Sequence, residues 1–137
     1  MLRLVPILVL GAFALLNLVR GSIHAFAPDG GAHSIAGLDL SNNAQTILSL
    51  FATLGLHQIV LGLFEGWIVV WRRDLVRAVL VLQTVETALG VANLYFYRPL
   101  PVHVPGERFN AILLGILVIT LIATWRSAAP APRPPPL

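Results

Sequence analysis

The sequence predicts an all-α fold, an antiparallel up-down bundle of four transmembrane helices with a long outer loop between the first and second helices. Hydrophobic residues make up 57% of the 137 residues, charged residues make up 11%, and the mean hydropathy is +0.83. Soluble domains carry about a quarter charged residues, so this composition indicates a membrane protein. Since one crossing needs about 20 apolar residues, the length accommodates four crossings and a single domain.

Four apolar runs define the expected helices, at residues 2–20, 46–70, 75–97 and 108–126. The first run resembles a signal peptide followed by Ala25-Phe26-Ala27, but Pro28 would then occupy the first mature position, so we expect this helix to be retained. The sequence Pro28-Asp29-Gly30-Gly31 predicts a tight turn in the first loop. Only Trp71-Arg72-Arg73-Asp74 separates the second and third runs, which predicts a hairpin.

The end of the chain differs in composition from the rest. Its last eleven positions, 127–137, are rich in proline, which cannot continue a helix. We therefore expect a four-helix membrane domain over residues 1–126 and a disordered Pro-rich tail over residues 127–137.

The distribution of arginine predicts the orientation in the membrane. With four crossings, both termini and the hairpin lie on one side. That side holds six arginines (Arg3, Arg72, Arg73, Arg77, Arg126 and Arg133), and the other side holds three (Arg20, Arg98 and Arg108). The positive-inside rule therefore predicts a multi-pass membrane protein with its N- and C-termini in the cytoplasm.

Several function classes find no support in the sequence. The chain has no cysteine, which excludes disulfides, thiolate metal ligands and a cysteine nucleophile. All nine basic residues are arginines at the ends of apolar runs, a pattern of topology signals and lipid headgroup contacts rather than of nucleic-acid binding. No nucleophile elbow, phosphate loop or dinucleotide fingerprint is present.

Two ionisable residues lie near the middle of neighbouring predicted helices. At 1.5 Å per residue, His57 and Glu86 both fall close to the bilayer midplane on antiparallel helices. An ionisable group in hydrocarbon costs several kcal/mol unless it is paired or faces a cavity, so it marks a functional hypothesis. We expect His57 and Glu86 to face each other and to be the catalytic pair if the protein is an enzyme.

Further polar residues extend from this pair toward the outer side and predict a slot between the second and third helices. At 100° per residue, the polar side chains of each helix share one face that contains His57 or Glu86. The first helix and its loop would stand at the mouth of the slot. The candidate ligand-binding residues are Asn17, Arg20, His24, Asp29, His33, Thr53, Gln83 and Asn93. The alternative is that His57, Gln83 and Glu86 only hold the helices together by cross-bonds.

Two other features predict contacts of a structural kind. Glu65 and Arg77 lie at similar depth on the cytoplasmic side of their helices, which predicts an ion pair. Gly62 and Gly66 form a G-x-x-x-G pattern, which favours close helix packing and permits a homo-oligomer.

A metal or haem site is a weaker hypothesis. His24, His33 and His103 are all expected on the outer side, with His57 below them. No two histidines have a metal-ligand spacing on one helix, so we expect neither a metal nor another cofactor.

The layout of four short spans, with Gly21-Ser-Ile-His24 and the run from His24 to Gly31 after the first helix, resembles that of small bacterial DoxX-like and related uncharacterised four-helix membrane proteins. The resemblance covers residues 1–126 and carries no functional residue over. It implies a protein of the bacterial cytoplasmic (inner) membrane, sometimes an accessory subunit.

The functional expectation is a small accessory protein, surrounded by membrane lipid, that binds a lipophilic small molecule in the slot. A second hypothesis is a membrane isomerase or redox enzyme in which His57 and Glu86 exchange a proton with a lipid-soluble substrate. A third is a subunit of an oligomeric transporter, because four helices leave no room for a pore within one chain.

Overall fold

The computed structural model describes residues 4–100 and 103–126, so the predicted tail at 127–137 lies outside the described residues. The described part is all-helical, with four long helices: α1 (Val5–Phe26), α2 (Ala44–Trp71), α3 (Val76–Ala92) and α4 (Pro105–Arg126). A 3-10 turn, η1 (Arg73–Leu75), precedes α3, and a π-helical turn, η2 (Asn93–Tyr97), extends it. With these turns counted as part of α3, all four helices are long and apolar enough to cross a membrane.

The helix ends follow from local backbone chemistry. The first helix extends to Phe26, beyond its expected end at residue 20, and stops where Ala27 becomes extended (φ −68°, ψ 146°). Ala27 precedes a proline, and proline disfavours the α conformation in the residue before it. The last helix begins at Pro105, since a proline at the first helical position sacrifices no hydrogen bond.

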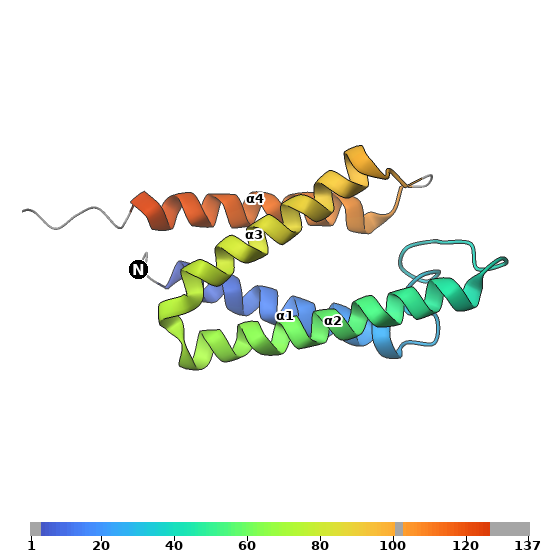
Figure 1. Cartoon of the computed structure of the whole chain (residues 1–137), viewed down its shortest axis with the longest axis horizontal. Coiled ribbons are helices and arrows are strands. Elements are labelled where there is room, and N and C mark those ends of the chain that lie inside the picture. The colour runs from blue at the N-terminus through green and yellow to red at the C-terminus, as the bar shows by residue number, and fades with distance from the viewer. Residues whose placement is uncertain (1–3, 101–102, 127–137) are drawn as a thin grey trace, which may run out of the picture.

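The helices pair in a way that the sequence did not predict (Figure 1). The chain direction alternates from helix to helix, but α1 packs mainly against α2, and α3 packs mainly against α4. From the hairpin at η1 onward, α2 and α3 diverge, and they contact each other little. The expected close pairing of the second and third helices is therefore confined to the hairpin.

Glycines allow the close approach of α1 and α2. A Cβ atom placed on Gly55 would lie 2.5 Å from the backbone nitrogen of Ala25 and 2.6 Å from the carbonyl oxygen of Gly21. One placed on Gly62 would lie 2.8 Å from the carbonyl oxygen of Ala14. Small residues permit such backbone contact between membrane helices. Gly62 therefore packs on α1, whereas a Cβ atom on Gly66 would meet open space.

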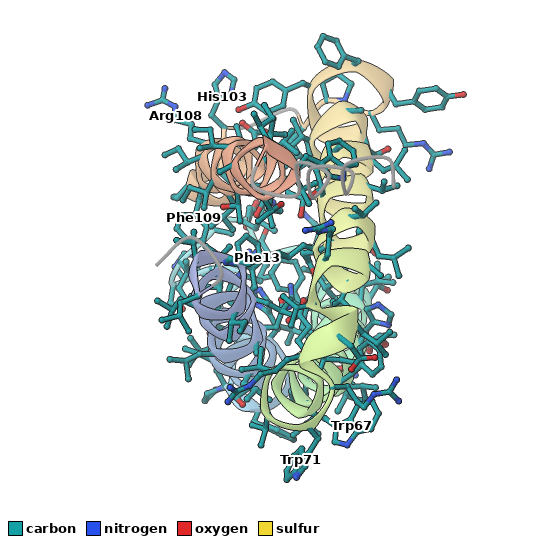
Figure 2. All side chains as sticks on the ribbon, turned by 90° about the vertical axis from the view of Figure 1, so that its left-hand side faces the viewer. Phe13, Trp67, Trp71, His103, Arg108 and Phe109 are labelled. Carbon is teal, nitrogen blue, oxygen red and sulfur yellow. The ribbon has the colours of Figure 1, made fainter. Side chains whose placement is uncertain are left out.

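An apolar core closes the half of the bundle nearer the hairpin. All four helices contribute to it: Leu10, Phe13, Ile68, Val76, Val79, Leu80, Leu117 and Leu121. Figure 2 shows Phe13 pointing into the space between the helices, whereas Trp67 and Trp71 project outward. The other half of the bundle, toward the loop after α1, contains the polar residues described next.

We predict that Gly55→Ala lowers the free energy of unfolding by about 1–3 kcal/mol, because the added methyl group meets backbone atoms of α1 that cannot rotate away. The thermal midpoint of the protein in detergent, followed by circular dichroism, measures the loss. Gly66→Ala on the same helix is the matched control, and it should melt at or slightly above the wild-type temperature, since alanine favours helix. Equal midpoints for Gly55→Ala and wild type would contradict the close contact.

Candidate functional site

A cavity of about 170 Å³, here called the inner cavity, lies where the four helices face one another. Its polar lining residues come from every helix: Asn17, Arg20, His57, Gln58, Gln83, Glu86, Thr87 and Asn110. The predicted slot between the second and third helices is therefore part of a wider site that also includes α1 and α4.

His57 and Glu86, the predicted catalytic pair, both line the inner cavity. Glu86 Oε2 accepts hydrogen bonds from Gln83 Nε2 at 2.9 Å and from the Thr87 hydroxyl at 3.5 Å, and Gln83 Nε2 also lies 3.3 Å from the Thr87 hydroxyl. Within the described residues no hydrogen bond or ion pair joins His57 to Glu86. The two side chains thus share a cavity, and their proton exchange stays a prediction.

Glu65 has a different partner from the one predicted. It is 0% exposed, its Oε2 accepts a 2.9 Å hydrogen bond from Asn17 Nδ2, and its Oε1 has no partner in the described part of the chain. The ion pairs among residues 4–100 and 103–126 are Arg72–Asp74 and His103–Glu107, so the predicted Glu65–Arg77 pair is not formed. The reason is helical phase: Glu65 lies one turn after Gly62, on the face of α2 that packs on α1.

Arg20 connects α1 to α4 at the edge of the inner cavity. Its Nη1 donates to Asn110 Oδ1 at 3.2 Å, and its guanidinium carbon lies 5.9 Å from the centroid of the Phe109 ring. Figure 2 shows Phe109 between α4 and α1. A cation at this distance from an aromatic ring is attracted by the ring electrons. Glu86 lines the same cavity from α3, but no hydrogen bond or ion pair joins it to Arg20.

A second cavity of about 590 Å³, here called the outer cavity, adjoins the first on the loop side. Its lining is mostly apolar and includes Ile23, Ile35, Phe51, Leu94 and Phe109. The two cavities share four lining residues: Leu16, Arg20, Leu54 and Asn110. The Arg20–Asn110 hydrogen bond therefore lies at the boundary between a polar space and an apolar one.

The loop after α1 forms a wall of the outer cavity and is held by its own hydrogen bonds. Asp29 accepts from the backbone N–H of Ser34 at 2.7 Å and of Gly31 at 3.0 Å, and these bonds lower the pKa of Asp29 to about 2. Gly30 and Gly31 adopt φ values of +58° and +75°, as the predicted tight turn requires. Asp29 thus orders the loop and lines neither the inner nor the outer cavity.

His24 ties this loop to the helices. Its Nδ1 lies 2.7 Å from the carbonyl oxygen of Gly30, and its ring packs edge-on against Phe51 with 5.2 Å between the ring centroids. With Nδ1–H as the donor, Nε2 remains an acceptor. His24 lines the outer cavity, so this predicted site residue is retained, but away from His57 and Glu86.

Three other predicted ligand-binding residues line neither cavity. His33 Nδ1 lies 3.1 Å from the carbonyl oxygen of Leu38, and Thr53 donates to the carbonyl oxygen of Ser49 on its own helix at 2.8 Å. Asn93 begins η2 and is exposed. No three His, Asp or Glu side chains among the described residues gather closely enough to hold a metal ion.

Gln58, Thr87, Phe109 and Asn110 are site residues that sequence reasoning missed. Gln58 follows His57 in the chain and Thr87 follows Glu86, so their positions next to predicted site residues could have identified them. Asn110 and Phe109 could not be found in this way, because the fourth helix has no ionisable residue near its middle and was left out of the predicted slot. No protein-family model, curated protein or solved structure matches the chain.

We predict that Glu65→Leu lowers the free energy of unfolding by about 1–3 kcal/mol, because it leaves the buried Asn17 amide without its acceptor. Glu65→Gln keeps an acceptor oxygen and should melt close to the wild-type temperature. The double variant Asn17→Leu with Glu65→Leu removes both partners and should recover most of the loss. Thermal midpoints in detergent compare the variants, and equal losses for Glu65→Gln and Glu65→Leu would contradict this role of the hydrogen bond.

Proposed function

We propose that the chain is a small multi-pass protein of the bacterial cytoplasmic membrane that binds a lipophilic small molecule in the inner and outer cavities. The observation that carries this proposal is the junction of the two cavities at Arg20 and Asn110. Ligand pockets are mostly apolar, with a few convergent polar groups, and occupy about 300–1,000 Å³. The outer cavity fits this range, and the inner cavity supplies the polar groups.

The arrangement favours an accessory, non-catalytic role. Most of the polar side chains of the inner cavity have partners within the chain: Asn17 bonds Glu65, Gln83 bonds Glu86, and Arg20 bonds Asn110. The first and third of these bonds link two helices, and the second fixes the position of the Glu86 side chain. Binding needs side chains that are held in place in this way. We also propose that the chain is related to the DoxX-like four-helix membrane proteins that its layout resembles. Such a relationship is consistent with an accessory role.

An enzyme acting on a lipid-soluble substrate is the second candidate function. The observation in its favour is that His57 and Glu86 line the same cavity. Glu86 is already preorganised by Gln83 and Thr87, and one imidazole nitrogen of His57 can accept a proton while the other donates one.

The proposed orientation places the loop after α1 outside the cell and the hairpin in the cytoplasm. Because the chain has no cysteine, single-cysteine variants can be labelled without background. We predict that Asn42→Cys in intact cells reacts with a membrane-impermeant maleimide, and that Arg73→Cys, its matched hairpin control, reacts only after permeabilisation. Both positions are exposed, so burial does not protect either thiol. The opposite labelling pattern would contradict the proposed orientation.

We predict that the protein, extracted in native membrane discs without detergent, carries a copurifying lipophilic molecule that native mass spectrometry detects. Leu54→Trp, which adds bulk at a residue shared by both cavities, should reduce its occupancy at least about fivefold, because the ligand and the indole compete for one space. Leu63→Trp, on the exposed face of the same helix, is the matched control and should leave the occupancy unchanged.

The same measurement separates the two candidate functions. A binding protein releases the molecule unaltered. An enzyme converts an added ligand to a product, which differs from the ligand in mass after a redox reaction and in chromatographic retention after an isomerisation. His57→Gln should abolish that conversion while the protein stays folded. A wild-type protein without any bound lipophilic molecule would overturn the proposed function.

A further inference from the structure

The chemistry of the inner cavity narrows the class of ligand, an inference that rests on the proposed function. Arg20 and Glu86 line this cavity from α1 and α3, and no ion pair joins them. Their formal charges at pH 7 are opposite and cancel. A ligand that adds an unpaired charge to this balanced pair would have to be desolvated without a counter-charge, which is costly in a membrane.

Each of the two side chains has hydrogen-bonding capacity that the chain does not use. A guanidinium carries five N–H donors, and among the described residues Arg20 makes one side-chain hydrogen bond, to Asn110. Glu86 Oε2 accepts from Gln83 and Thr87, and Glu86 Oε1 accepts from no described residue. The cavity therefore offers donors on the α1 side and a carboxylate acceptor on the α3 side.

We infer that the ligand is an uncharged amphiphile with a hydroxyl group, which accepts a hydrogen bond from Arg20 and donates one to Glu86. A hydroxyl both donates and accepts, so it satisfies both sides at once. The inner cavity, at about 170 Å³, is smaller than a complete ligand pocket and holds only the head. The apolar outer cavity, at about 590 Å³, then holds hydrocarbon beyond the shared residues Leu16 and Leu54.

Four probes with one alkyl chain test this inference: dodecanol, its methyl ether, the dodecanoate anion and dodecyltrimethylammonium. Each competes with tritium-labelled dodecanol for the full chain in phospholipid nanodiscs, with binding to empty nanodiscs subtracted. Dodecanol should bind at least about tenfold more tightly than the methyl ether, which accepts from Arg20 but has no proton for Glu86. Both ions should bind more weakly than dodecanol.

The Glu86→Gln variant tests the charge balance directly. It leaves Arg20 without its compensating charge. The affinity for dodecanoate relative to dodecanol should therefore rise at least about tenfold. Asp74→Asn, at the exposed hairpin, is the matched control that also removes one carboxylate. It should bind the four probes in the same order of affinity as the wild-type protein. If Glu86→Gln does not fold, the order of the four probes on the wild-type protein still tests the inference.

The outcomes separate the inference from the proposed function. If no probe binds saturably, the proposed function fails and the inference fails with it. If the probes bind saturably but the ether equals the alcohol, or an ion binds best, the cavities do bind an amphiphile and only the inference is overturned. A preference for dodecanol over dodecanoate that Glu86→Gln leaves unchanged would also overturn it.

Discussion

The close contact of α1 with α2 is the constraint on which the rest of the structure depends. At Gly21, Gly55 and Gly62 the two backbones meet without intervening side chains. This contact commits one face of α2 to α1, so α3 leaves the hairpin along a different path and packs on α4. The inner cavity lies between these two helix pairs. A bundle in which α2 packed along the whole of α3 would have little space for it.

The same contact explains how the buried carboxylate is accommodated. Glu65 follows Gly62 by one turn, so it enters the α1–α2 interface and meets Asn17. In a membrane helix a polar group needs either a partner on another helix or a cavity to face. Glu65 has a partner on another helix, and Asn17 has both. Asn17 bonds Glu65 and also lines the inner cavity, which connects the packing of the first helix pair to the candidate site.

The candidate site is asymmetric along the bundle. The apolar core closes the half near the hairpin, the inner cavity follows, and the outer cavity reaches the ordered loop after α1. Arg20 stands where the polar and apolar spaces meet, held by Asn110 and by the ring of Phe109. Under the proposed function, the charge of Arg20 would influence which ligand headgroups bind.

The sequence by itself determined the number of helices, their approximate bounds, the tight turn at Asp29 and the depth of His57 and Glu86 along their helices. These features follow from local signals: apolar length, proline and glycine positions, and depth counted along a helix. Only the tertiary structure decided that Glu65 pairs with Asn17 rather than Arg77, and that Asn110 belongs to the site. Partners across helices depend on how each helix is rotated about its axis. In lipid that rotation is set by the fit of small residues on two different segments, which hydropathy along one segment does not encode.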